Sequence, residues 1–192
     1  MQVFQFTRGD WVQRGQDIDT GNESCFNLEL SADGSTIVSG YTFSDFENDY
    51  TAVGHIRVWS FDATSQQWKQ KGQDLNALVP PFSPQQGYSV GEFLNLSQDG
   101  NRIVVSVSES PLPSGHVEGP IEYLLTFDWK SSEWKQSGEL TRVVASNLVS
   151  TAMSDDGEVL ATNALDMIFG HGIVKTMYWN DYDTTNSTQE IA

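Results

Sequence analysis

The motif W-x-Q-x-G occurs three times in this chain and sets the period of its architecture. Its copies are WVQRGQDI (11–18), WKQKGQDL (68–75) and WKQSGEL (134–140). Successive copies lie about 60 residues apart, a spacing typical of proteins built from stacked structural repeats.

Two further motifs recur in the same order. The first is S-x-D-G followed by an apolar run, in LSADGSTIVSG (30–40), LSQDGNRIVVS (96–106) and MSDDGEVLATN (153–163). The second is a strand with an aromatic end, in GHIRVWSFD (54–62), GPIEYLLTFD (119–128) and GIVKTMYWN (172–180). MQVFQF (1–6) is a truncated fourth copy of the second motif.

Each unit is predicted to hold four β-strands. In FNLEL (26–30), Phe26, Leu28 and Leu30 alternate with polar residues, which predicts that these three side chains form the buried face of a strand. Asp33-Gly34 then predicts a tight hairpin turn, because glycine adopts positive φ at little cost. The repeated Asp33, Asp99 and Asp156 are interpreted as turn residues and not as catalytic ones.

The W-x-Q-x-G stretch is the most polar of the four strands, which is typical of an outer edge strand. We expect its tryptophan to cover the sheet while the indole N–H stays in water. Its glycine predicts a bulge or bend.

These patterns predict an all-β fold of four-stranded antiparallel units. Residues 1–180 form the repeat domain, and we expect the polar tail 181–192 to be disordered. The predicted unit boundaries are 1–20, 21–77, 78–141 and 142–180.

The same motifs resemble β-propeller repeats. S-x-D-G with its apolar pair, followed by G-H-I-R-V-W, resembles WD40-type blades, and GYSVGEFLNLSQDGNRIVVS (87–106) resembles the FG-GAP repeats of integrin α chains. W-x-Q-x-G is similar to repeats of uncharacterised propeller-like proteins of protists and algae. The resemblance covers nearly the whole chain and implies blades, but it implies little about function.

The repeat count leaves two architectures open. The chain holds fewer blades than the usual four to eight, so an incomplete or partner-completed propeller is favoured over a closed three-sheet, prism-like barrel. Pairing of residues 11–18 with the strand at 172–180 would close the molecule. An open arc would need a protein partner or a larger complex, and a homodimer is one form that this could take.

The charge balance excludes several partner classes. The chain has 26 acidic and 10 basic residues and a formal charge of −16. Such a surface repels phosphate backbones, so we expect no nucleic-acid partner. No long apolar run predicts a membrane span, and no signal peptide is recognised at the start, which favours a cytoplasmic or organellar location. Cys25 is the single cysteine and is predicted to be a buried free thiol.

The sequence offers two candidate metal sites. His55, His116 and His171 each follow a glycine and could form a three-histidine zinc set, although structural roles at turns are favoured. Asp45, Glu47 and Asp49 alternate as calcium ligands do, but Tyr50 stands where a calcium loop needs glycine. The FG-GAP calcium loop would lie where this chain has only the short turns SADGS, SQDGN and SDDGE. The sequence therefore predicts no cofactor, with calcium at 45–49 as the alternative.

Function is weakly determined by these residues. The variable loops at 41–53, 78–88 and 108–120 form the expected binding rim, with candidate contacts Phe46, Tyr50, Phe82 and His116. The predicted function is a non-catalytic protein-binding scaffold. The alternative is a carbohydrate-binding or carbohydrate-active domain with a central pocket. No catalytic motif is present, which favours a non-catalytic role, and an enzymatic role is left open as the less favoured alternative.

Overall fold

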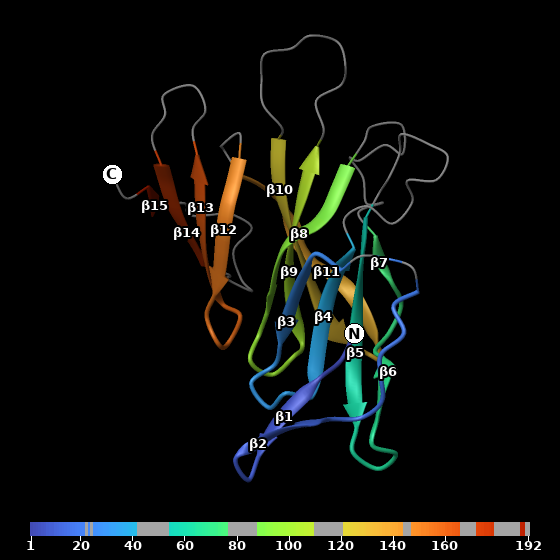
Figure 1. The fold of residues 1–192 in the computed structure, drawn as a ribbon. Helices are drawn as coiled ribbons and strands as arrows, with labels where there is room; N and C mark the ends of the chain where they lie inside the picture. The colour runs from blue at the N-terminus through green and yellow to red at the C-terminus, as the bar shows by residue number, and fades with distance from the viewer. Residues whose placement is uncertain are drawn as a thin grey trace.

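The structure is a computed structural model that describes the backbone of residues 1–21, 23, 25–41, 54–76, 88–109, 121–143, 147–165, 172–178 and 189–190. These residues form β-strands and turns, which confirms the all-β prediction (Figure 1). Over this part of the chain, no helix is long and apolar enough to cross a membrane.

The first residues form a two-stranded antiparallel hairpin, which we call the N-terminal hairpin. Its strands are β1 (Phe4–Thr7) and β2 (Asp10–Gln13). Sheet 1 follows, with neighbouring strands in chain order and β7 pairing with the start of β5. Its strands are β3 (Asn27–Leu30), β4 (Thr36–Tyr41), β5 (His55–Asp62), β6 (Gln67–Gln70) and β7 (Leu75–Asn76).

Two four-stranded antiparallel sheets complete the described fold. Sheet 2 comprises β8 (Tyr88–Leu96), β9 (Arg102–Glu109), β10 (Ile121–Lys130) and β11 (Glu133–Val143). Sheet 3 comprises β12 (Asn147–Met153), β13 (Val159–Leu165), β14 (Gly172–Tyr178) and β15 (Gln189–Glu190).

The Asp-Gly turns have the conformation that the sequence predicts. Gly34, Gly100 and Gly157 adopt φ of 67°, 70° and 75°. In each turn a serine hydroxyl donates to the aspartate, in the pairs Ser31–Asp33 (2.7 Å), Ser97–Asp99 (2.6 Å) and Ser154–Asp156 (2.6 Å). Each carboxylate also accepts a backbone N–H two residues later. The three aspartates therefore fix turn geometry, as predicted.

Backbone hydrogen bonds also join the turns of neighbouring sheets. The N–H of Ala32 donates to the carbonyl of Gln98 at 3.0 Å, and the N–H of Gln98 donates to the carbonyl of Asp155 at 2.8 Å. The three turns are thus linked into one row that holds the sheets in register.

The sheets pack face to face. Val38, Ile56 and Val58 of sheet 1 share a core cluster with Leu94 and Val105 of sheet 2. A second cluster joins sheet 2 to sheet 3, through Val104, Leu124, Leu160 and the partly buried Met153. Burial between sheets supplies the main stabilisation, because one sheet alone leaves both its faces in water.

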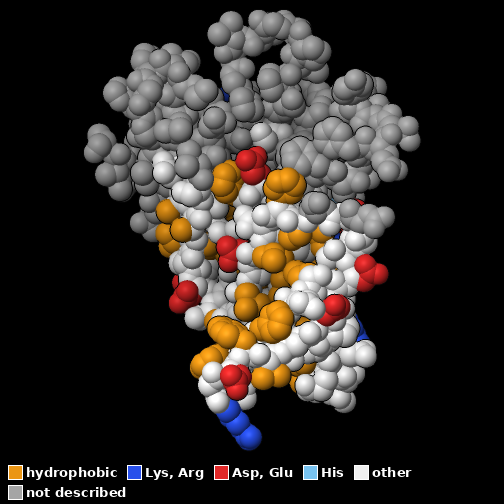
Figure 2. Space-filling model, viewed as in Figure 1, with side chains coloured by type: hydrophobic (Ala, Val, Ile, Leu, Met, Phe, Trp, Pro, Cys, Tyr) orange, Lys and Arg blue, Asp and Glu red, His pale blue; other side chains and the backbone are white. Residues whose placement is uncertain are grey.

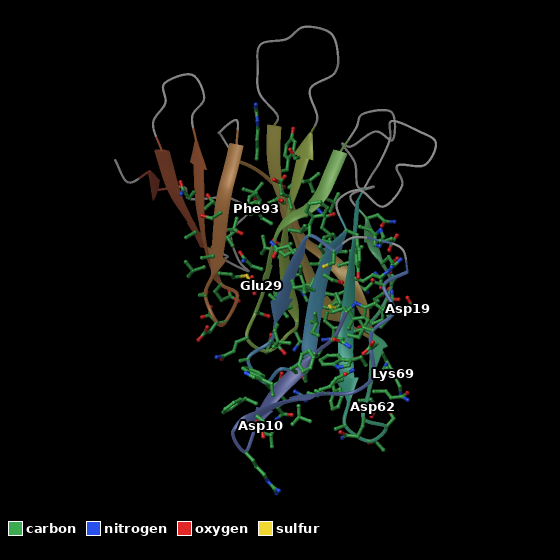
Figure 3. All side chains as sticks on the ribbon, in the orientation of Figure 1. Asp10, Asp19, Glu29, Asp62, Lys69 and Phe93 are labelled. Carbon is green, nitrogen blue, oxygen red and sulfur yellow. The ribbon has the colours of Figure 1, made fainter. Side chains whose placement is uncertain are left out.

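The first strand of sheet 1 differs from the prediction. Phe26, Leu28 and Leu30 were expected on the buried face, but they are exposed by 61%, 49% and 52%. The intervening Glu29, labelled in Figure 3, is partly buried, and this burial raises its pKa. The alternation was correctly predicted, but the apolar side of β3 is the side that no described sheet covers.

The W-x-Q-x-G motif forms the joint between consecutive units. A Cβ placed on Gly15 would lie 2.9 Å from Trp68 Cδ1, and a Cβ on Gly72 would lie 2.9 Å from Trp134 Cδ1. Both glycines have positive φ, 79° and 83°. Each tryptophan therefore packs against the glycine of the preceding unit, where no larger side chain fits without a shift.

Hydrogen bonds fix each tryptophan in that position. The indole N–H of Trp68 donates to the carbonyl of Arg14, and that of Trp134 donates to the carbonyl of Lys71, both at 2.8 Å. The amide of Gln16 donates to the carbonyl of Trp68 and accepts its backbone N–H. Gln73 makes the same two bonds to Trp134.

A cation completes each joint. The Arg14 guanidinium lies 4.3 Å from the ring centre of Phe61 and donates to the carbonyl of Gly34 in the next turn. Lys71 lies 5.2 Å from the ring of Trp134 and donates to the carbonyl of Gly100. The basic residue before the glycine thus connects the aromatic ring and the Asp-Gly turn of the following unit.

These contacts correct the expectation that the tryptophan N–H stays in water. Trp68 and Trp134 are only 3% exposed, because the preceding unit covers them. The predicted bend is present: β6 ends before Gly72 and β7 begins after it, and the register of β11 shifts between Ser137 and Thr141.

The described strands form an open arrangement. β2 pairs with β1, and the described partners of β14 are β13 and β15, so the N-terminal hairpin does not close on sheet 3. In Figure 1 the hairpin lies at the bottom, below β3 and β4, and sheet 3 lies at the upper left. The open form is therefore confirmed over the closed prism.

The joint predicts a specific cost for filling its glycine. Gly72→Ala should lower the free energy of unfolding by about 1–3 kcal/mol more than Gly9→Ala, because overpacking adds to backbone strain. Gly9 is the matched control, since it also has positive φ but has no atom within 4 Å of an added Cβ. Urea denaturation measures both; equal losses would show that the contact with Trp134 is not limiting.

The turn aspartates predict acid sensitivity. Hydrogen bonds from Ser31 and Ser154 lower the pKa of Asp33 and Asp156, and in Asp99 the bonds from Ser97 and Asn101 outweigh a burial effect that raises the pKa. A pKa below its unfolded value contributes stability above that value, which is lost as the pH falls through the folded-state pKa.

Unfolding free energy should therefore decline as the pH falls below about 4, and should decline less steeply in a variant carrying Ser31→Ala, Ser97→Ala and Ser154→Ala. Chemical denaturation at a series of pH values tests this. Identical pH dependence of the two proteins would contradict a role for the serine–aspartate pairs.

Candidate functional site

The described residues bring one dense polar cluster together, at the end of sheet 1 where β5 begins. His55, the first residue of β5, is 7% exposed, and Tyr41, the last residue of β4, is fully buried. The two residues are partners across the strands, and their rings stack with centroids 4.9 Å apart. The imidazole is thereby held at the sheet end, where the chain segments between strands depart.

Arg57 organises the acidic part of this cluster. It lies two residues after His55, so both side chains project from the same face of β5. Its guanidinium contacts Glu23 Oε2 through Nη1 at 2.6 Å and contacts both oxygens of Asp74 through Nε at 3.0 and 3.1 Å. His55 Nε2 lies 3.4 Å from Glu23 Oε2 and 4.0 Å from Asp74 Oδ2. We call Glu23, Tyr41, His55, Arg57 and Asp74 the sheet-end cluster.

The electrostatics of the sheet-end cluster follow from burial and pairing. Burial tends to lower the pKa of Arg57, but its hydrogen bonds and charge interactions with Asp74 and Glu23 raise it overall. Burial raises the pKa of Tyr41, and this effect outweighs the hydrogen bond from Ser39, which lowers the pKa. Arg57 therefore remains a cation and Tyr41 a neutral phenol. The side chains of Glu23 and Asp74 retain 24% and 34% exposure, so a ligand can reach them.

Chemically, the cluster offers acceptors and donors side by side. The carboxylates accept hydrogen bonds, and the guanidinium and a protonated ring nitrogen donate them. With His55 neutral the cluster has two negative charges and one positive charge. It suits a ligand rich in hydroxyl groups, which both donate and accept, better than it suits an anion.

Sequence reasoning did not identify this cluster as a site. Only His55 was considered, as part of a three-histidine set, and His116 and His171 lie outside the described residues. One signal was present: Asp74 belongs to the repeated W-x-Q-x-G-Q-D stretch, and Gln70 of the same stretch donates to it at 2.7 Å. Glu23 and Arg57 come from separate elements and carry no shared motif.

The remaining predicted site residues lie outside the described residues. These are Asp45, Phe46, Glu47, Asp49, Tyr50, Phe82 and His116. Within the part of the chain that the structure describes, no group of three or more His, Cys, Asp or Glu side chains could hold a metal ion. Cys25 is a partly buried free thiol whose pKa is raised by burial.

Comparisons with known proteins identify the fold and no family. No family model matches the chain, and no curated protein matches its sequence. A crystal structure of a protein from Lactobacillus plantarum aligns with a TM-score of 0.63 at 10% identity, over 98% of this chain and 48% of the other. The chain has a β-propeller-like fold. It spans about half the length of that solved structure.

Two further solved structures align more distantly. The tricorn protease aligns with a TM-score of 0.48 at 10% identity, over 95% of this chain and 19% of the other. A putative 6-phosphogluconolactonase from Bacteroides fragilis aligns with a TM-score of 0.30 at 12% identity, over 97% of this chain and 76% of the other.

These findings correct the functional prediction. The alignment with the Lactobacillus plantarum protein shows the fold alone, and nothing in the comparisons supports a scaffold role. The non-catalytic, protein-binding scaffold predicted from the repeats is therefore wrong, because the blade pattern on which it rested reports only the fold. The resemblance to WD40 and FG-GAP blades in particular stays a prediction.

The sheet-end cluster predicts that Arg57 is a stabilising residue. Arg57→Ala should lower the free energy of unfolding by about 1–3 kcal/mol, because two partly buried carboxylates lose their charged donor. Lys69→Ala is the control, since it removes the exposed Lys69–Asp62 bridge and should cost clearly less than Arg57→Ala. Chemical denaturation compares the two variants; equal costs would contradict the central position of Arg57.

Proposed function

We propose that this chain binds neutral carbohydrate at the sheet-end cluster. The observation that carries the proposal is the convergence of Glu23, His55, Arg57 and Asp74 within hydrogen-bonding or ion-pairing distance, while the carboxylates stay partly exposed. Protein sites that select hydroxyl-bearing ligands use such fixed polar groups, because an unpaired buried partner is costly.

Charge defines the ligand class more closely. The cluster has a net formal charge of about −1, and the whole chain has −16. Both disfavour phosphorylated or carboxylated sugars. A neutral saccharide avoids this repulsion and can donate its hydroxyl hydrogens to Glu23 and Asp74.

The position of the cluster also supports a binding role. His55 and Tyr41 stand at the strand ends that border the segment 42–53, and binding residues often lie on the connections of a rigid scaffold. Tyr41 and the bidentate Arg57–Asp74 pair hold the polar groups in place, so little conformational freedom is lost when a ligand binds.

Glycan-array screening followed by calorimetric titration tests the proposal. Neutral saccharides should bind, and Glu23→Gln and Asp74→Asn should each weaken binding at least about tenfold, because an amide accepts fewer and weaker hydrogen bonds than a carboxylate. Asp62→Asn is the matched control, because Asp62 is a carboxylate near the other end of β5 (Figure 3).

Two results would count against this function. One is the absence of binding across neutral glycans by protein with an unchanged melting temperature. The other is a preference for anionic sugars that Glu23→Gln and Asp74→Asn leave unaltered.

A further inference from the structure

Large apolar side chains remain exposed on the N-terminal hairpin and on β3. Trp11 is 70% exposed and Phe6 is 60% exposed, although their rings contact each other at 5.3 Å. Leu28 and Leu30 on β3 are about half exposed. Figure 2 shows hydrophobic side chains gathered along this side of the molecule. We call Phe6, Trp11, Leu28 and Leu30 the receiving face.

The equivalent side chains of later units are buried. Phe6–Trp11 corresponds to the pairs Phe61–Trp68 and Trp129–Trp134, whose rings lie 5.2 and 5.3 Å apart. Trp68 and Trp134, which correspond to Trp11, are each 3% exposed. Leu28 lies five residues before its Asp-Gly turn, as Leu94 does, and Leu94 is 2% exposed. The receiving face therefore combines joint surfaces of two units, the N-terminal hairpin and sheet 1, that no described sheet covers.

The internal joints show what such a face binds. Leu94 packs in the core cluster that contains Val38, Ile56 and Val58 of the preceding sheet. The complementary surface is thus a sheet that presents small apolar side chains from its second and third strands. Any occupant of the receiving face should be a β-sheet of this same repeat.

Sheet 3 has one small apolar side chain of this kind, Ala161, in its second strand. Leu160 packs toward sheet 2 with Val104, so its neighbour Ala161 projects from the opposite side of β13. Ala161 holds the same place after its Asp-Gly turn as Val38 and Val104, both of which pack against the next sheet. Ala161 and Asn163 therefore belong to the face of sheet 3 that corresponds to the packed faces of sheets 1 and 2.

We infer that a second copy of this chain docks head to tail, with the Ala161 side of its sheet 3 on the receiving face. Sheet 3 of each copy then covers the receiving face of the other, and two such contacts close a pair. The length of the Lactobacillus plantarum structure agrees, since this chain aligns with about half of it. The contact uses apolar area, so it can overcome the repulsion between two acidic copies at physiological salt.

Sedimentation equilibrium on residues 1–192 at about 0.15 M salt tests the inference. The chain should form a dimer, and Trp11→Ala and Leu28→Asp should each raise its dissociation constant at least about tenfold. Ala161→Asp should do the same from the other end. Asn163→Glu changes a second residue on the same side of β13 and should also raise the dissociation constant. Gln5→Ala is the control, because Gln5 is exposed on the opposite side of β1.

Each outcome has a defined meaning. A monomer at all concentrations overturns the inference. A dimer that Leu28→Asp disrupts but that Ala161→Asp and Asn163→Glu leave intact also overturns it, since two receiving faces would then meet each other. Melting temperatures close to that of the unchanged chain show that a loss of dimer is not a loss of fold, because the substituted side chains of the receiving face are exposed.

Discussion

The packing of each buried tryptophan on the glycine of the preceding unit is the constraint on which the structure depends. Trp68 meets Gly15 and Trp134 meets Gly72 with no space for a Cβ, while a glutamine amide pairs with the tryptophan backbone. The cation before the glycine then reaches the next Asp-Gly turn. One short sequence therefore connects the outer strand, the aromatic layer and the turn of the adjoining unit.

The sheet-end cluster shares residues with this joint. Gln73 holds Trp134, and the next residue, Asp74, holds Arg57. Leu75 then enters β7 and pairs with Ile56, beside His55. The Asp74 carboxylate is thus positioned by residues 73–75, which are held on one side by Trp134 and on the other by Ile56. Packing of sheet 2 on sheet 1 consequently limits the freedom of the Asp74 carboxylate, although Asp74 itself lies between β6 and β7 of sheet 1.

Local chemistry explains which features the sequence could predict. The Asp-Gly turns and the strand alternation depend on residues that are neighbours along the chain, so the motif at 31–34 predicts them directly. The burial of Trp68 depends on Gly15, and the exposure of Leu28 depends on which sheet lies opposite. Neither can be predicted from one unit alone. The sheet-end cluster was missed for the same reason, because Glu23, Arg57 and Asp74 meet only after the strands pair.

The row of hydrogen bonds from Ala32 to Gln98 and from Gln98 to Asp155 joins each turn only to its immediate neighbours. Each tryptophan joint likewise connects a unit only to the unit next to it. Energetic coupling between units in this molecule is therefore limited to nearest neighbours. The total free energy of unfolding is then the sum of the stabilities of the single units and the interface energies of adjacent pairs. Whole repeats can in that case be duplicated or lost in evolution while each remaining boundary keeps its chemistry. The length of the chain in such a lineage would then change by one whole repeat at a time.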